Sequence, residues 1–358
     1  MQYQSTQNKH SKILLLLIIL SLLIYSVFAY DLVRTDYVKL LLLYSTSFLL
    51  FYKLVQLAKQ SFKLLAWTAF AFRLIFLLSI PNLSQDFYRF LWDGRLILEG
   101  INPYLSTPNQ LINSGSESIN QAVLLHNEMT DLNTVNFSNY TPFNQLLFFI
   151  AAVFSGKSIL GSVMVLRLII SAADLGTLFY GRKLLRLLKK PEHHIFWFIL
   201  NPLVIIEFTG NLHFEGVMIF FLIWSLYLLH KGYWRWAAIV FGCSVSVKLI
   251  TLLFIPLFIH YLGWRKWFIF SSIVALITIA FFIPFLSSEL ITNYSQTLSL
   301  YFQKFEFNAS IYYLAREVGF LFRGWNEIAI IGKLMASIVF IAVILMAFLR
   351  ENKAPYNW

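Results

Sequence analysis

The sequence predicts an all-α, polytopic membrane protein. Of its 358 residues, 59% are hydrophobic and 13% are charged, whereas a soluble domain carries about 25% charged residues. The mean hydropathy is +0.69, and the apolar residues gather in runs that approach the roughly 20 residues a spanning helix needs. We therefore expect one integral membrane domain over residues 1–358, with about ten spans plus shorter or re-entrant segments.

Charge patterning excludes one class of partner. The formal net charge is +11, but the basic residues form short clusters between apolar runs, as cytoplasmic loops do under the positive-inside rule. We therefore expect no nucleic-acid partner. The single cysteine, Cys243, excludes an intrachain disulfide bond. The sequence contains no Walker A loop, which argues against a nucleotide-driven pump.

Three apolar runs near the amino terminus set the predicted topology. They cover residues 13–30, 38–57 and 64–80. Because the basic amino terminus is expected in the cytoplasm, three crossings place Ser84 outside. Arg73 lies in the middle of the third run, where a charged side chain must face protein or water. It is expected either to pair with a buried acid or to belong to a site.

The later apolar runs predict the remaining spans. They cover residues 158–180, 195–209, 217–229, 267–285 and 328–349. The basic cluster Gly181–Lys190 is expected in the cytoplasm, so the short apolar run over residues 142–157 is expected to be re-entrant or half-inserted. Residues 236–264 have basic groups at both ends, and we expect a hairpin whose apex lies near Lys248 at the outer surface.

Two external segments are expected, over residues 82–141 and 286–326. The middle of the first, residues 106–139, is rich in Asn, Ser, Gln and Thr. Loops of this length are usually functional or disordered, so we expect an irregular or mobile loop over the site. The second segment is expected to be partly helical.

The stretch SQDFYRFLWDGRLILEGINPY, residues Ser84–Tyr104, is the densest cluster of charges and aromatics in the chain. Read as a helix, it places Asp86, Arg89 and Asp93 on one face. Gly100 and the Asn-Pro pair that follows predict its end. The plain interpretation is an amphipathic helix at the membrane interface with internal ion pairs.

The predicted topology brings several polar groups to the outer face of the membrane. They are Asp86, Asp93, Glu207, His213, Glu215, Lys248 and Arg316. A carboxylate near an intramembrane cation could act as a general base while charged groups hold a phosphate. The alternative is that these residues lie at headgroup level and pair with one another structurally.

Part of this stretch, DFYRFLWDGRLILEGINPY, resembles the first external loop of GT-C fold glycosyltransferases. The similarity is greatest to bacterial polyprenol-phosphate-mannose-dependent mannosyltransferases. Five further similar stretches follow in the same order: NYTPF (139–143), AADLGTLFY (172–180), NPLVIIEFTGNLHFEG (201–216), SVKLITLLFIP (246–256) and FNASIYYL (307–314). The similarity covers most of the chain and begins near Arg73.

The resemblance implies a membrane enzyme that moves a hexose, expected to be mannose, from a polyprenyl-phosphate carrier to a lipid or glycan acceptor. The active site would face outward from a bacterial inner membrane, and the reaction would invert the anomeric centre. Asp86 is implied as the general base, with Asp93 as the second carboxylate. Lys248 is implied as the phosphate ligand, with Arg89 or Arg95 helping. The other expected substrate contacts are Tyr104, Glu207, His213, Glu215 and Arg316.

The sequence departs from the family pattern at one position. Some relatives have two acids one residue apart in this loop, whereas Gln85 precedes Asp86 here. We therefore expect no obligatory metal and no cofactor beyond the lipid-linked sugar donor. Two other functions stay open. One is a transporter or flippase of a lipid-linked sugar, which paired broken helices in two similar halves would favour, and the other is a noncatalytic membrane scaffold.

Overall fold

The computed structural model describes residues 2–115, 119–303, 306 and 310–349. All regular elements in this part of the chain are helices, so the expected all-α class is confirmed. The longer ones are α1 (Gln2–Tyr30), α2 (Tyr37–Ala58), α3 (Phe62–Ile75), α9 (Ile159–Leu187), α11 (Glu215–His230), α12 (Trp234–Val247), α13 (Ile259–Phe282) and α16 (Ile328–Leu349). Between them lie α4 (Asp86–Leu98), α5 (Pro108–Asn113), α6 (Ala122–Glu128), α7 (Asp131–Val135), α8 (Pro142–Ser155), α14 (Ser288–Gln303) and α15 (Ser310–Arg323). The short helical turns are η1 (Glu192–Ile195), α10 (Phe196–Ile199), η2 (Val204–Gly210), η3 (Leu249–Phe258) and η4 (Ile283–Phe285).

Five helical stretches among the described residues are long and apolar enough to cross a membrane. They lie in α1, α2, α9, the joined η3–α13–η4 stretch and α16. The number rises to six if η2 and α11, between which the helix direction bends by 112°, form one broken span. The protein is therefore polytopic, with fewer such stretches than the sequence suggests. The reason is that α3 and α12 have only 14 residues each, and the run over residues 195–209 is divided between short turns.

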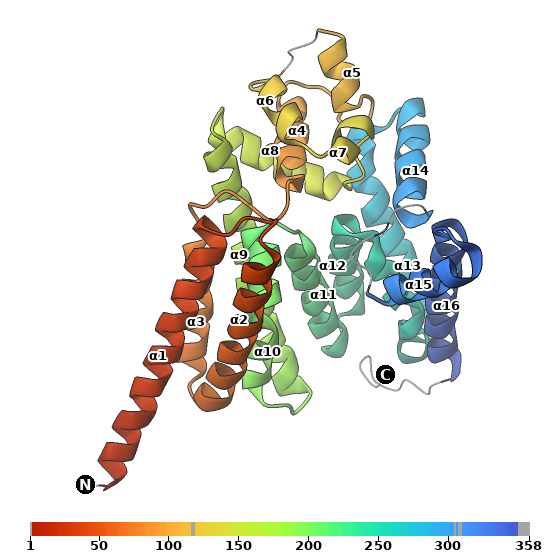
Figure 1. The fold of residues 1–358 in the computed structure, drawn as a ribbon. Helices are drawn as coiled ribbons and strands as arrows, with labels where there is room; N and C mark the ends of the chain where they lie inside the picture. The colour runs from red at the N-terminus through yellow and green to blue at the C-terminus, as the bar shows by residue number, and fades with distance from the viewer. Residues whose placement is uncertain (1, 116–118, 304–305, 307–309, 350–358) are drawn as a thin grey trace.

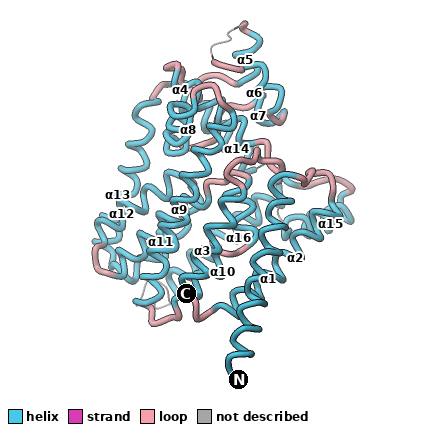
Figure 2. The backbone as a smooth tube through the Cα atoms, turned by 90° about the vertical axis from the view of Figure 1, so that its left-hand side faces the viewer, coloured by secondary structure: helices cyan, strands magenta, loops and turns pink. Residues whose placement is uncertain are grey.

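The helices are arranged in two layers (Figure 1). The long helices run side by side, and α4 to α8 gather at the end of the molecule away from the start of α1 and the end of α16. We call α4–α8 the outer cap; α14 lies beside it in both Figure 1 and Figure 2. The 14-residue α8 packs against α4 and α9. Its length is too short for a span, which agrees with the expectation that this run does not cross.

Buried arginines hold the long helices together. Arg73 of α3 forms an ion pair with Asp174 of α9, with 2.7 Å between Nε and Oδ2 and both side chains 2% exposed. Pairing with a buried acid, one of the two expectations for Arg73, is thereby confirmed. Arg167 of α9 donates hydrogen bonds to five carbonyl groups, those of Phe76, Leu77, Ser79, Thr209 and Gly210. These carbonyls lie at or beyond the ends of α3 and η2, where backbone acceptors lack helical partners.

The chain reverses at Lys248, as the sequence predicts. The helix α12 ends at Val247, and Lys248 has extended backbone angles (φ −146°, ψ 127°) before η3 begins. The hydroxyl of Tyr261 donates to the carbonyl of Leu229 over 3.0 Å, so the chain beyond η3 returns to the level at which α12 starts. Lys248 is therefore the apex of a helical hairpin.

Candidate functional site

The helix α4 is the centre of the outer cap. It covers Asp86–Leu98 as the charge spacing predicts, and Gly100 follows it with a φ of +74°, a left-handed conformation that glycine adopts without strain. Phe90 stacks on Phe148 of α8 with ring centroids 4.6 Å apart. Nine of the 13 residues of α4 are buried. The predicted ion pair within the helix is present between Arg89 and Asp93, but most of α4 is packed inside the protein.

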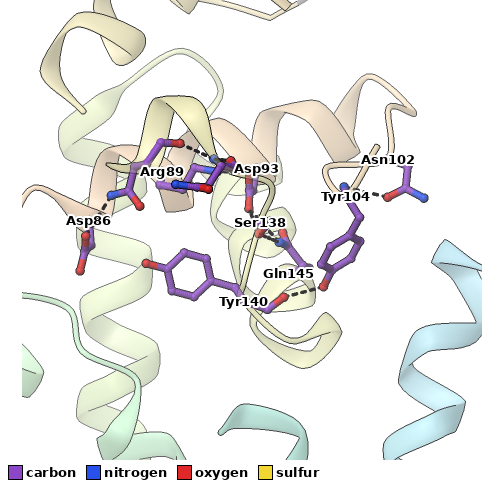
Figure 3. A network of polar contacts seen from close by, with 10 residues as sticks. Asp86, Arg89, Asp93, Asn102, Tyr104, Ser138, Tyr140 and Gln145 are labelled. Carbon is purple, nitrogen blue, oxygen red and sulfur yellow. Dashed lines mark hydrogen bonds and ion pairs between the residues drawn. The ribbon is translucent and has the colours of Figure 1, made fainter. Parts of the chain in front are cut away.

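A closed polar network runs along the buried side of α4 (Figure 3). Arg89 Nε and Asp93 Oδ1 form an ion pair at 2.8 Å, and Asp93 is 0% exposed. The second carboxylate oxygen of Asp93 accepts hydrogen bonds from Ser138 Oγ at 2.6 Å and Gln145 Nε2 at 2.8 Å. Buried charges are tolerated when they are paired and hydrogen-bonded in this way. Asp93 therefore ties α4 to Ser138, before α8, and to Gln145 within α8.

Two guanidinium groups of α4 bind the backbone of the loop above them. Arg89 Nη1 donates to the carbonyls of Asn133 at 2.6 Å and Asn136 at 3.0 Å. Arg95 Nη1 donates to the carbonyl of Asn120 at 2.5 Å, and its Nη2 reaches the carbonyl of Lys157 at 3.3 Å. Burial lowers the pKa of Arg95 from its ordinary value. These contacts fix the path of the loop between α4 and α9.

The loop over residues 106–139 is more regular than its composition predicts. It contains the three short helices α5, α6 and α7. Thr107 caps α5 reciprocally with Gln110, and the side chain of Thr130 caps α7 at Asn133; such caps satisfy amide groups that a helix start leaves unpaired. The expectation of an irregular loop is therefore wrong for the described residues.

Asp86 differs from Asp93 in two ways. Its side chain is only half-buried, and among the described residues its carboxylate accepts a hydrogen bond at one oxygen. Its Oδ1 accepts a hydrogen bond of 3.0 Å from Asn133 Nδ2. Burial raises the pKa of Tyr140 well above its ordinary value, and the charge of Asp86 raises it further. Burial and the same charge raise the pKa of Tyr301 of α14 to about 12. Both phenols therefore stay protonated near neutral pH and remain able to donate hydrogen bonds.

A short segment, residues 138–145, joins the region of Asp86 to the apex of the hairpin. Its position is fixed at one end by Tyr104, whose hydroxyl donates to the carbonyl of Tyr140 over 2.6 Å. At the other end, Thr141 Oγ1 donates to the carbonyl of Ser246, and Asn144 Nδ2 donates to that of Val247 over 2.9 Å. We call residues 138–145 the bridging segment. It therefore lies beside Asp86 at Tyr140 (Figure 3) and is bound to the two residues that precede Lys248.

Lys248 is an accessible cation that directly follows the residues bound by the bridging segment. Its side chain is 45% exposed and forms an ion pair with Glu215 Oε1 at the start of α11. His213 lies just before Glu215, and its Nδ1 is 3.5 Å from Glu207 Oε2. Glu207 also accepts a hydrogen bond of 2.8 Å from the hydroxyl of Tyr44 of α2. This row of residues therefore runs from Lys248 towards α2.

Comparison with known proteins identifies the family. A family model described as the N-terminal domain of alpha-(1->6)-mannopyranosyltransferase matches residues 14–263, more than half of the chain. The chain belongs to this mannosyltransferase family. A second family model, described as ALG3 protein, matches residues 189–356. The membership agrees with the resemblance to GT-C mannosyltransferases that the sequence motifs indicate.

One curated relative of the mannosyltransferase family is alpha-(1->6)-mannopyranosyltransferase A of Mycobacterium tuberculosis. It is 24% identical over 185 residues, which cover 50% of this chain and 33% of that protein. The match thus spans about a third of the length of the relative. No solved structure matches the chain.

The structure brings together some of the residues that the sequence predicts for a mannosyltransferase site, and separates others. Asp86 lies beside Tyr140 of the bridging segment (Figure 3), and Lys248, which pairs with Glu215, follows the two residues whose carbonyls this segment binds. Tyr104 is 0% exposed and supports the bridging segment from behind. Arg316 lies on α15, far from the outer cap in Figure 1, where it pairs with Glu306 and Glu317. Within the described part of the chain, no three His, Cys, Asp or Glu side chains gather as a metal site would require.

Four residues of the polar network are not among the site residues that the sequence predicts. They are Asn133, Ser138, Tyr140 and Gln145. Ser138, Tyr140 and Gln145 lie in the bridging segment, which includes the stretch NYTPF. That motif was the one available signal, because nothing in a polar loop marks the single amide that reaches a carboxylate 47 residues away.

Gly94 allows α4 and α8 to pack at backbone contact. A Cβ atom at Gly94 would lie 2.3 Å from the carbonyl oxygen of Phe148, so Gly94→Ala must push the two helices apart. Overpacking typically costs about 1–3 kcal/mol, and we expect the upper end because the obstacle is backbone. Thermal unfolding of the purified protein, followed by tryptophan fluorescence, measures the loss.

The matched control is Leu98→Ala in the same helix, where the side chain is 43% exposed. It should leave the unfolding midpoint within about 0.5 kcal/mol of wild type, as surface changes usually do. Equal midpoints for Gly94→Ala and wild type would contradict the close packing of α4 on α8.

Proposed function

We propose that this chain transfers mannose from a polyprenyl-phosphate carrier to a hydroxyl of a lipid or glycan acceptor, at the outer face of a bacterial inner membrane. The observation that supports the proposal is the bridging segment, which lies beside Asp86 at Tyr140 and is hydrogen-bonded to the chain just before the accessible Lys248. Membership of a mannosyltransferase family supports mannose as the sugar.

Asp86 suits the acceptor hydroxyl, which must lose a proton, and Lys248 suits the leaving phosphate, which gains negative charge. Asp86 removes the proton of the acceptor hydroxyl as its oxygen attacks C1 of the mannosyl group. The C1–O bond to the phosphate breaks, and the polyprenyl phosphate leaves with the bonding electron pair. Attack from the face opposite the phosphate inverts C1. Lys248 stabilises the charge that develops on the leaving phosphate, and Asp86 then releases its proton to water.

Asp93 and Arg89 serve this reaction as positioning residues. Both oxygens of Asp93 are engaged by protein donors, and the side chain is fully buried. A carboxylate without access to solvent cannot reach an acceptor hydroxyl, so we assign the general base to Asp86 alone. Arg95 is likewise occupied by backbone carbonyls and by the side chain of Gln121.

Glu215 forms an ion pair with Lys248 while no substrate is bound. A phosphate that enters the site would take over the lysine, since it offers several anionic oxygens to the same donor. Glu215 and His213 would then be free to bind sugar hydroxyls. We therefore assign Lys248 to the carrier phosphate, and Glu215 with His213 to the sugar.

Replacement of Lys248 tests the proposed donor. Lys248→Met keeps the length of the side chain and removes its charge. We expect the KM for polyprenyl-phosphate-mannose to rise about 10- to 100-fold, because a hydrogen bond to a charged group contributes about 1.5–3 kcal/mol. The KM for an oligomannoside acceptor should change less. The assay measures transfer of radiolabelled mannose by protein reconstituted in liposomes.

The control is Lys157→Met, an exposed lysine at the turn after α8, which should leave both constants unchanged. Use of GDP-mannose in place of the lipid donor by the wild type would contradict the proposed carrier. Movement of the lipid donor across the bilayer without mannose transfer would instead establish the transporter. The described residues contain one bent helix pair, whereas transporters of that kind place such helices in two matching halves.

A further inference from the structure

The hydroxyl of Tyr140 faces the candidate base and has no hydrogen-bond partner among the described residues (Figure 3). The ring of Tyr140 reaches towards Asp86 in Figure 3. Hydrogen bonds within the described part of the chain engage its backbone carbonyl but not its hydroxyl. The side chain is half-buried. The Tyr140 hydroxyl is therefore a donor that no described residue uses, next to a carboxylate that can accept, and a ligand can contact both groups.

The ring itself is held firmly. Phe90 and Phe148 pack edge-on against it, with centroids at 4.9 and 5.5 Å. The backbone carbonyl of Tyr140 is bound by the hydroxyl of Tyr104, and the next residue, Thr141, is bound to the hairpin apex. The orientation of the Tyr140 hydroxyl is therefore set before any ligand arrives, which reduces the entropy lost on binding.

We propose that Tyr140 is a substrate-binding residue whose hydroxyl donates a hydrogen bond to a sugar oxygen while Asp86 accepts one from a hydroxyl of the same substrate. A carbohydrate hydroxyl both donates and accepts, and a rigid phenol next to a carboxylate offers one group of each kind. The ligand that Tyr140 and Asp86 would bind is a mannose ring, and either the lipid-linked donor or the acceptor supplies it. The inference rests on the proposed mannosyl transfer.

The variant Tyr140→Phe tests this assignment because it removes only the hydroxyl and retains both ring contacts. A neutral hydrogen bond contributes about 0.5–1.5 kcal/mol, so the KM of the substrate that Tyr140 binds should rise roughly 2- to 12-fold. The unfolding midpoint should not change. A higher KM for the acceptor assigns Tyr140 to the acceptor sugar, and a higher KM for polyprenyl-phosphate-mannose assigns it to the donor sugar.

The control is Tyr88→Phe, a phenol on α4 whose pKa is raised by burial and by the charge of Glu128 rather than by Asp86. It should leave both KM values unchanged. If neither KM moves in Tyr140→Phe, or if only the unfolding midpoint falls, the binding role is overturned and Tyr140 is a packing residue.

A binding measurement separates this inference from the proposed function. Saturation-transfer NMR with α-1,6-mannobiose reports sugar contact whether or not mannose is transferred. Weaker saturation transfer in Tyr140→Phe than in wild type and Tyr88→Phe would support the sugar site even if the wild type shows no transferase activity. Wild-type protein that neither transfers mannose nor contacts mannobiose would overturn both.

Discussion

Asp86→Asn is expected to reduce mannosyl transfer about 10²- to 10⁴-fold, the usual contribution of a general base. Asparagine retains an oxygen that can accept the hydrogen bond from Asn133, so the site keeps its shape. The loss should therefore fall on kcat, with little change in the KM of the lipid donor. Single-turnover transfer from radiolabelled polyprenyl-phosphate-mannose measures the chemical step directly.

The exposed Asp131 of α7 provides the control, because Asp131→Asn makes the same chemical change in the outer cap. It should retain wild-type kcat. Asp93→Asn should behave differently from both, since it leaves the charge of the buried Arg89 without its partner and destabilises the fold. Asp86→Asn protein that retains more than a tenth of wild-type kcat would exclude Asp86 as the base.

Removal of one partner of the Arg73–Asp174 ion pair should have the largest effect on stability. Asp174→Asn leaves a guanidinium charge buried between α3 and α9, where both side chains are 2% exposed. Breaking a buried pair in this way typically costs about 3–5 kcal/mol. Titration of the purified protein from mild detergent into SDS measures the free energy of unfolding.

The double variant Arg73→Leu with Asp174→Leu should recover most of that loss. Replacing a buried pair by apolar residues is often neutral or stabilising, and this pair leaves Arg73 Nη2 and Asp174 Oδ1 without hydrogen-bond partners among the described residues. The exposed pair of Lys39 with Asp31 is the control, and Asp31→Asn should cost no more than about 1 kcal/mol. A double variant as unstable as Asp174→Asn would show that the pair is needed for more than mutual neutralisation.

Local signals in the sequence were sufficient for α4 and for the hairpin. The spacing of Asp86, Arg89 and Asp93 predicts one helical face, and Gly100 predicts the end of the helix; the structure has both. The basic groups at both ends of residues 236–264 likewise predict the reversal at Lys248. The features of α4 depend on residues within one or two helical turns of each other, and the hairpin depends on the two ends of one continuous apolar run; a sequence pattern captures both.

The division of roles between the two carboxylates of α4 could not be predicted in the same way. The helical spacing puts Asp86 and Asp93 on the same face, and it does not reveal that Ser138 and Gln145 bind Asp93 from 45 and 52 residues away. Hydropathy also overcounts spans, since an apolar run such as 64–80 does not reveal that α3 ends after 14 residues. Tertiary contacts determine both outcomes.

The way in which Arg89 and Arg95 hold the outer loop has a consequence for how such enzymes diversify. Most of their loop contacts are to carbonyl groups, those of Asn120, Asn133, Asn136 and Lys157. Every amino acid supplies a carbonyl, so most positions in the loop can change identity while the chain keeps its path. Under selection for a new acceptor, the side chains on the loop surface can therefore change while the carboxylate of Asp86 on α4 stays in place.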